Sequence, residues 1–258
     1  MRRIVSFLLI TLCISAVKAQ SYSDAFDEAF GRNDVVAQRE ALRLWQREAP
    51  DDVNYFIARY NFYANRALSP NASVVVTPLA DSGLVAIDEG IVRYPDRLDL
   101  RLGKIFFLGE LHRWDTFVDE IVRTLDYSLQ IDHQWTFPNV QSDMMEELLV
   151  ESMADYMSTM YQSIADTAHL TAADSLMTRR IQTVAKRTVQ LFPDDFSSIY
   201  MLALSHLVLR QNEKAYKYLL RAEALDNTSI PILQSLVRVC NLLGKKAQAA
   251  EYQSRLNH

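Results

Sequence analysis

The sequence predicts an all-α protein built from successive antiparallel helical hairpins, and three observations support this fold class. Apolar residues recur with the period of a helix along most of the chain. Only six of the 258 residues are glycine, although hairpin turns and phosphate-binding loops need residues that tolerate positive φ. The residue pattern of the C-terminal part also repeats at a fixed spacing. These features predict helices joined by short connections and leave no glycine-rich loop for a nucleotide.

The first nineteen residues have the composition of a secretory signal peptide. A short basic head precedes an apolar run over residues 4–14 that is too short for a permanent membrane span, and Ala19 supplies a small residue at the end. We expect an N-terminal signal peptide over residues 1–19, cleaved after Ala19. A lipoprotein with Cys13 as the lipidated residue is the alternative, but Leu12 stands where that signal requires a small side chain.

Charge and cysteine content limit the partners of the mature chain. Cleavage would remove three basic residues and no acidic one, so the net charge of −5 would become −8. This acidity argues against nucleic acid and against an anionic membrane surface as partners. Only Cys240 would remain, so we expect no internal disulfide. No second long apolar segment follows, and we expect no membrane span after cleavage.

The apolar period places helices along almost the whole mature chain. We expect helices over residues 22–30, 34–49, 52–67, 80–94, 97–111, 114–129, 143–166, 171–191, 196–210, 213–226, 230–243 and 246–256. Asp143 with Glu146, and Thr171 with Asp174, are expected to cap the first turns of two of them.

Two stretches interrupt this rhythm. Residues 68–78 contain two prolines and a β-branched run, so we expect an extended loop there. In the second stretch, residues 130–140, Trp135 and Phe137 are expected to fold back onto the core. Two N-glycosylation patterns begin at Asn71 and Asn227, and they matter only in a eukaryotic secretory pathway.

The C-terminal part repeats itself after thirty-four residues. Seven positions between Ile199 and Ala222 recur between Leu233 and Leu256 with mostly matching side-chain size. This period and pattern resemble the tetratricopeptide repeat (TPR). Small residues should then lie where helices approach most closely, and these are Ala203, Ala215 and Ala222. Gly244 is expected to end a helix in a left-handed conformation.

The same boundary signal is written twice, as Pro-Asp-Asp at residues 50–52 and again at residues 193–195. In each copy proline ends one helix and an aspartate suits the N-cap of the next. The resemblance implies a right-handed α-solenoid of antiparallel hairpins. It divides the mature chain into N-terminal TPR-like repeats (20–129), an atypical long-helix segment (130–192) and C-terminal TPR repeats (193–258). A plain helical bundle, or a degenerate hairpin repeat of another kind, remains the alternative.

The resemblance also implies a binding surface, because the first helices of such hairpins line a concave groove that holds peptides. The residues carried onto this groove are Asn54, Asn61, Asn65, Arg97, Lys104, Gln234, Arg238 and Asn241. The three asparagines share one helix face and could bind a peptide backbone, whereas the basic residues could pair with carboxylates. The full Lys-Asn-Asn-Lys-Arg set of the peptide-clamping members of this family is not present. The alternative is that these are ordinary solvated helix residues.

Other residue groups give weak signals for metal binding. Three methionines at helical spacing could ligate Cu(I), but core packing explains them more simply: Met153, Met157 and Met160. Three polar residues could line one helix face as hard ligands, but a hydrated helix start explains them better: His112, Asp115 and Asp119. We therefore expect no metal and no cofactor.

The sequence contains no motif that indicates catalysis, because no zinc-protease, nucleophile-elbow or local Cys–His signature is present. Cys240 is expected to be buried and inert. The sequence therefore predicts an exported protein-interaction scaffold of the bacterial periplasm or cell exterior, binding a protein or peptide partner. A small exported hydrolase or ligand-binding helical protein, with its site in residues 130–191, is the alternative.

Overall fold

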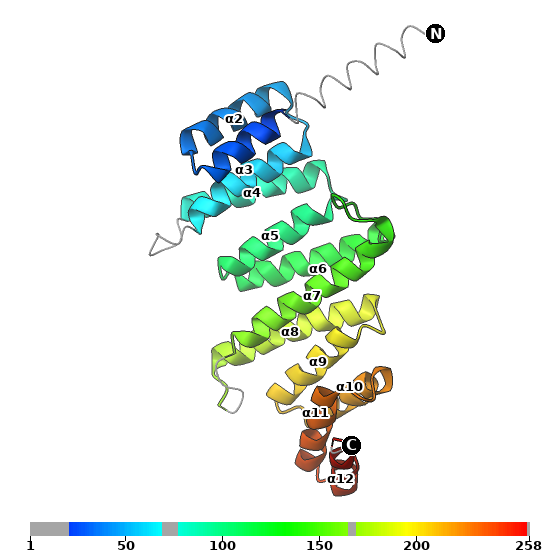
Figure 1. Ribbon diagram of the computed structural model, residues 1–258. Helices are drawn as coiled ribbons and strands as arrows, with labels where there is room; N and C mark the ends of the chain where they lie inside the picture. Colours follow the sequence, from blue (N-terminus) through cyan, green and yellow to red (C-terminus); the bar gives the residue numbers. More distant parts are fainter. Residues whose placement is uncertain (1–20, 69–76, 165–168, 257–258) are drawn as a thin grey trace, which may run out of the picture. The chain divides into compact units, whose positions relative to one another are not determined.

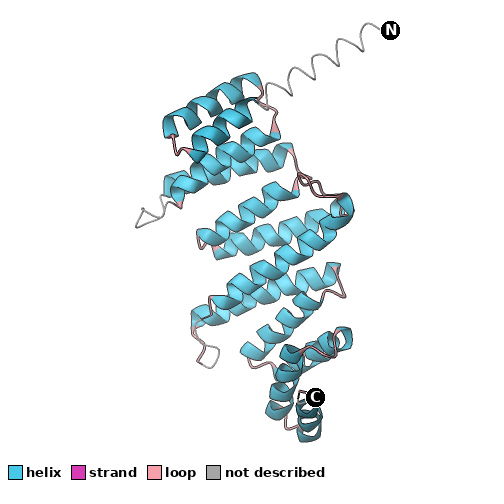
Figure 2. Ribbon diagram, viewed as in Figure 1, coloured by secondary structure: helices cyan, strands magenta, loops and turns pink. Residues whose placement is uncertain are grey.

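The computed structural model describes residues 21–68, 77–164 and 169–256. Within these ranges the chain forms α-helices and one 3-10 turn, with no β-strand, which confirms the all-α prediction (Figure 2). The signal-peptide prediction, the loop over residues 69–76 and the glycosylation pattern at Asn71 lie outside the described residues. None of the described helices is both long enough and apolar enough to cross a membrane.

The helices follow the predicted order and nearly the predicted bounds (Figure 1). After a helix over residues 21–31 come α2 (Val35–Glu48), α3 (Val53–Ala67), α4 (Thr77–Arg93), α5 (Leu98–Glu110), α6 (Trp114–Gln130), the 3-10 turn Ser142–Met144, α7 (Met145–Gln162), α8 (Ala172–Leu191), α9 (Phe196–Val208), α10 (Asn212–Leu225), α11 (Ile230–Leu242) and α12 (Lys246–Arg255). The largest shift is at the end of α7, which stops at Gln162 rather than at residue 166. Helix α4 begins three residues earlier than predicted, at Thr77, because Pro78 is tolerated in a first turn.

The chain forms two compact units, one ending at Arg113 and one beginning at Trp114. In unit 1, α3 packs against α2 and extensively against α4, and α4 packs against α5. Its core is aromatic: Phe26, Trp45, Tyr55, Phe56 and Phe62 are all buried. The indole Nε1 of Trp45 donates to the carboxylate of Asp52 at 3.0 Å, so a buried polar group retains a partner.

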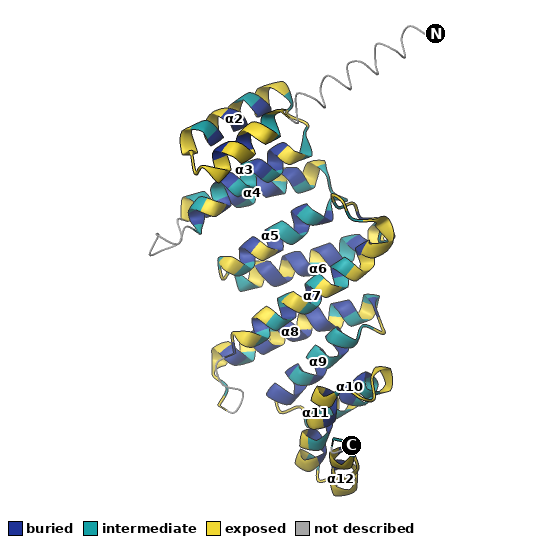
Figure 3. Cartoon of the chain, in the orientation of Figure 1, coloured by how far each residue is buried: buried dark blue, intermediate teal, exposed yellow. Residues whose placement is uncertain are grey.

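In unit 2 the helices from α7 to α12 each pack against the next one along the chain. The small residues that the repeat predicted at helix contacts are fully buried, since Ala203, Ala215 and Ala222 all have 0% exposure. Figure 3 shows the buried residues of the helices in dark blue. Cys240 is also fully buried in this core, as expected. Small side chains allow the helix axes to approach, so the packing follows the predicted stride.

The helix boundaries show which local signals were interpreted correctly. Asp52 caps α3 by accepting from the Asn54 amide, and Asp195 caps α9 by accepting from the Ser198 amide. The repeated Pro-Asp-Asp signal therefore performs the same task twice. Gly244 has φ +71°, the left-handed conformation predicted for a helix end.

The capping predictions for α7 and α8 had opposite outcomes. Thr171 and Asp174 form a reciprocal capping box at the start of α8, as predicted. The prediction for Asp143 was wrong, because a 3-10 turn occupies residues 142–144 and α7 begins at Met145 without a side-chain cap. The tighter turn moves Asp143 away from the first free amides of the helix.

The interrupted stretch before α7 does return to the core. Trp135 is buried, and its Nε1 donates to the Ser128 hydroxyl at 2.9 Å, whereas Phe137 is half-buried.

Candidate functional site

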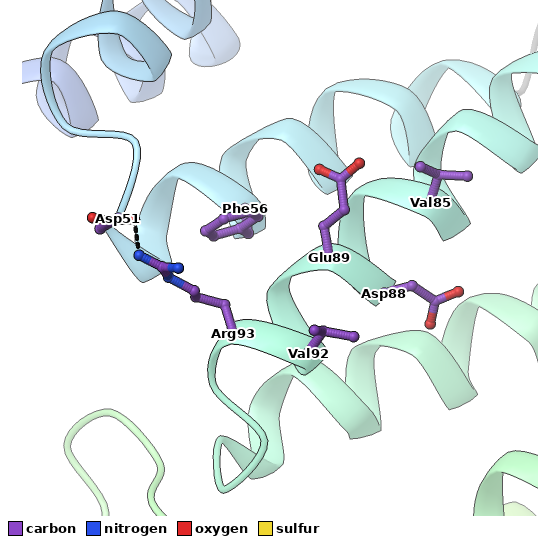
Figure 4. Close-up of a pocket in the computed structure, with 7 residues that line it drawn as sticks. All are labelled: Asp51, Phe56, Val85, Asp88, Glu89, Val92 and Arg93. Atoms are coloured by element: carbon purple, nitrogen blue, oxygen red, sulfur yellow. Dashed lines mark hydrogen bonds and ion pairs between the residues drawn. The ribbon is translucent and has the colours of Figure 1, made fainter.

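One side of α4 carries an open hollow with an apolar floor, which we call the apolar hollow. Its volume is about 480 Å³, and it is lined by Asp51, Phe56, Val85, Asp88, Glu89, Val92 and Arg93 (Figure 4). Phe56 comes from α3, and the two valines and their acidic neighbours come from α4. Ligand-binding clefts have volumes of this order.

The valines of the apolar hollow are unusually exposed. Val85 is 52% and Val92 is 82% exposed, and a spacing of seven residues places them on one face of α4. Single exposed apolar residues are common, but these two flank the same hollow above the buried ring of Phe56. The floor is therefore an apolar surface that a partner can cover.

Gly90 sets the position of that floor. A Cβ atom at Gly90 would lie 3.0 Å from Cβ of Phe56 and 3.5 Å from Cδ1 of Leu100, so glycine lets α3 and α4 approach closely. The close approach holds Phe56 under the hollow.

Ion pairs form the rim of the apolar hollow. Arg93 pairs with Asp51, Arg59 pairs with Glu89, and the ammonium Nζ of Lys104 lies 2.7 Å from Oδ1 of Asp88. Burial acts to lower the pKa of Arg59, but the hydrogen bond and charge of Glu89 outweigh burial and raise it. The rim thus offers both signs of charge around an apolar floor.

A second hollow, which we call the basic hollow, opens between α2, α3 and the start of α4. Its volume is about 360 Å³, and its lining includes four arginines but no carboxylate: Arg39, Leu42, Arg43, Gln46, Tyr55, Arg59, Phe62, Tyr63, Arg66 and Leu79. Arg59 lines this hollow and its ion-pair partner Glu89 lines the apolar hollow, so the two hollows adjoin at this pair.

The groove residues predicted on α3 point to another side of that helix. Asn54 and Asn65 are exposed and Asn61 is half-buried. At 3.6 residues per turn, these asparagines lie roughly 120° around the helix from Arg59 and Arg66. The asparagine face and the basic hollow are therefore separate surfaces.

Two of the three basic residues predicted for the groove already have carboxylate partners. Arg97 makes two hydrogen bonds to Asp99, at 2.8 and 2.7 Å, and Lys104 is largely buried beside Asp88. In unit 2 the three remaining predicted groove residues are exposed on α11: Gln234, Arg238 and Asn241. That these eight residues bind a peptide remains a prediction.

The residues considered for metal binding have other surroundings. Met153, Met157 and Met160 each have 0% exposure, which confirms the interpretation that they fill the core. Asp115 accepts two hydrogen bonds from Arg180, at 2.9 and 2.7 Å.

Residues 130–191 contain little that the hydrolase alternative needs. Among the described residues of this segment, Asp174 is the one buried carboxylate, and it belongs to the capping box of α8. A hollow of about 680 Å³ borders α7, and five acidic residues line it. Asp195 is half-buried and caps α9, and the other four are exposed: Asp143, Glu146, Glu147 and Asp194. A hydrolase that uses two carboxylates as acid and base needs a site shielded from water, where the pKa values of the two groups differ.

Sequence reasoning missed both hollows, although local signals existed. Val85 and Val92 are seven residues apart on a helix, as are Arg59 and Arg66. Such spacings predict a shared face, but they do not reveal whether another helix covers it.

Comparisons with known proteins show similarity only at the level of structure. No family model and no curated protein matches the chain. The crystal structure of PilW, a widely conserved type IV pilus biogenesis factor, is 13% identical, with 92% of this chain and 91% of PilW covered and a TM-score of 0.43. MamA from Desulfovibrio magneticus RS-1 is 17% identical, with 76% and 90% covered and a TM-score of 0.39. The TPR domain of P58(IPK) is 12% identical, with 92% and 68% covered and a TM-score of 0.36.

The fold assignment rests on the helices themselves. Helices α11 and α12 begin at Ile230 and Lys246, thirty-four residues after the starts of α9 and α10 at Phe196 and Asn212. Consecutive helices pack in pairs, and small residues occupy the contacts. The chain is a TPR-like helical repeat protein.

Proposed function

We propose that this chain is an exported helical-repeat scaffold that binds a segment of a protein partner through unit 1. The apolar hollow is the observation that carries the proposal, because Val85 and Val92 are exposed beside the buried ring of Phe56. The composition of the first nineteen residues supports export to the bacterial periplasm or the cell exterior.

Covering the apolar hollow would release a useful amount of free energy. Full burial of a valine side chain is worth roughly 1.5–3 kcal/mol relative to an exposed one. Val85 and Val92 lie roughly 10 Å apart along α4, so a partner segment needs two apolar side chains to cover both of them, with one contacting Phe56. The charged rim would orient the partner, since Arg93, Glu89 and Asp88 present both signs of charge to its polar groups.

A peptide-display experiment tests this proposal. Random peptides are selected against the purified chain, and recovered peptides are synthesised and titrated by fluorescence anisotropy. We expect the double variant Val85→Ser with Val92→Ser to bind them about tenfold more weakly, which corresponds to about 1.4 kcal/mol. Val36→Ser is the matched control, because Val36 is 79% exposed on α2 and lines neither hollow.

Two results would contradict the proposal: recovery of no peptide, or equal affinity for the double variant and the unchanged chain. The same titration with Asn61→Ala and Arg238→Ala tests the predicted groove. A loss of affinity in these variants, without a loss in the valine variant, would move the binding surface to the groove.

Export is tested separately with residues 1–25 fused to a reporter enzyme that is active only after secretion. Activity is expected, and its absence would remove the exported part of the proposal.

A further inference from the structure

The basic hollow is a surface that the proposed binding of an apolar side chain does not use. It gathers Arg39, Arg43, Arg59 and Arg66 on the surface of a chain whose net charge is −5. A cleft lined by one sign of charge focuses the electrostatic potential and attracts ligands of the opposite sign.

Two of these arginines are already neutralised within unit 1. Arg43 makes two hydrogen bonds to Glu40, at 2.9 and 2.7 Å, and Arg59 pairs with Glu89. Among the described residues, no carboxylate pairs with Arg39 or Arg66. The hollow therefore keeps two positive charges that its own residues do not balance.

Arg66 is held in place by neutral groups. Its guanidinium carbon lies 3.7 Å from the centre of the Phe62 ring, and its nitrogens donate to the Phe62 carbonyl at 2.5 Å and to Oε1 of Gln38 at 3.3 Å. Burial, together with the charge of Arg39, lowers the pKa of Arg66 below its ordinary value. The positive charge of Arg39 thus acts on Arg66 without a compensating negative charge, and a bound anion would reduce this repulsion.

We propose that the basic hollow binds a carboxylate group of an acidic peptide segment, with Arg39 and Arg66 as its partners. A planar guanidinium matches a carboxylate through paired hydrogen bonds. The aromatic walls formed by Tyr55, Phe62 and Tyr63 suit an organic ligand better than a small hydrated ion. This inference rests on the proposed function, because the carboxylate belongs to the segment that fills the adjoining apolar hollow.

The adjoining hollows define the chemistry of the partner. Arg59 and Glu89 separate them, so a peptide that crosses this ion pair places one side chain in each hollow. The matching segment carries an apolar residue close in sequence to Asp or Glu. The positive charge of the second hollow and the negative charge of that residue provide the complementarity.

The test uses the peptides recovered by display on the purified chain, each paired with an analogue in which Asp and Glu become Asn and Gln. We expect the acidic peptides to bind roughly tenfold more tightly than the amides, and this difference to disappear in Arg39→Gln. Arg39 is exposed, so its replacement leaves the fold intact. Arg47→Gln is the matched control, because Arg47 lies exposed on the same helix outside the hollow.

A second variant checks the site without any ligand. Arg39→Glu places a carboxylate beside Arg66, so we expect a higher thermal midpoint and no remaining preference for acidic peptides. Arg47→Glu should not raise the midpoint, because Arg47 already pairs with Glu48 and the replacement removes that ion pair.

The outcomes separate this inference from the proposed function. Recovered peptides that lack acidic residues, or equal affinity for acids and amides, would overturn the carboxylate site while the valine result still supported the scaffold. Recovery of no peptide would remove both. Displacement of the peptide by inorganic phosphate at a concentration below that of the peptide would assign the hollow to free anions and overturn the peptide proposal.

Discussion

Replacing Ala222 by leucine tests the claim that small residues set the spacing between helices in unit 2. Ala222 lies on α10 with 0% exposure, and α10 packs against both α9 and α11. Leucine adds three carbon atoms at a site where none of the alanine side chain reaches solvent. The added atoms must displace a neighbouring helix.

The expected cost follows from packing alone. Alanine and leucine have similar helix propensities, so the local backbone is scarcely affected. Overpacking a closed core costs about 1–3 kcal/mol, and we take about 2 kcal/mol for Ala222→Leu. For a unit of this size, that loss lowers the thermal midpoint by roughly 4–8 °C.

The assay is thermal and urea unfolding followed by circular dichroism. Ala224→Leu is the control, because Ala224 is exposed on the same helix two residues away. We expect this control to unfold within about 0.5 kcal/mol of the unchanged chain. Equal stability of the two variants would show that the repeat does not depend on close contact at Ala222.

Gly244→Ala should lower the free energy of unfolding by about 1 kcal/mol, because φ is +71° at this position. Gly31→Ala is the control, because no atom lies within 4 Å of the new Cβ, and it should be neutral or slightly stabilising in urea unfolding. Burial lowers the pKa of His206, although a hydrogen bond to Gln211 opposes the shift. The folded state therefore favours the neutral imidazole. The free energy of unfolding should fall as the pH drops below about 6.5, the ordinary pKa of histidine. His206→Gln should remove that part of the pH dependence. Cys240 is fully buried and burial raises its thiol pKa, so a thiol reagent should react with it only after unfolding.

Each of these predictions has a clear contrary result. A stabilising Gly244→Ala would mean that the left-handed turn is not retained in solution. A pH profile of His206→Gln parallel to that of the unchanged chain would place the titration elsewhere. Rapid labelling of Cys240 without denaturant would show that the contact between α11 and α12 opens easily.

Local sequence signals predicted the helices and several of their ends. The twelve predicted helical ranges match the observed helices to within about a turn. The range predicted for α7 is four residues too long at its C-terminal end, and its first residues form a 3-10 turn that was not predicted. Helical period, proline positions and capping side chains act over a few residues, which is why they can be read directly. The prediction that Asp143 caps a helix was wrong, because the path of the chain into α7, rather than the residue type, decides which amides lack partners.

The candidate surfaces depended on contacts that sequence spacing does not reveal. Lys104 looked available for a ligand, but a turn of the neighbouring helix brings Asp88 to it. Arg39 and Arg66 are twenty-seven residues apart and belong to different helices, and their meeting required α2 to pack on α3.

Helix bounds, the thirty-four-residue stride and the small residues that this stride buries could all be predicted from residue order, because each depends on neighbours along the chain or on a regular repeat. Tertiary packing decided which polar residues were already paired, which valines stayed uncovered and which arginines gathered without a carboxylate. Those outcomes depend on the balance of packing and charge between helices distant in sequence, and only their arrangement in space fixes that balance.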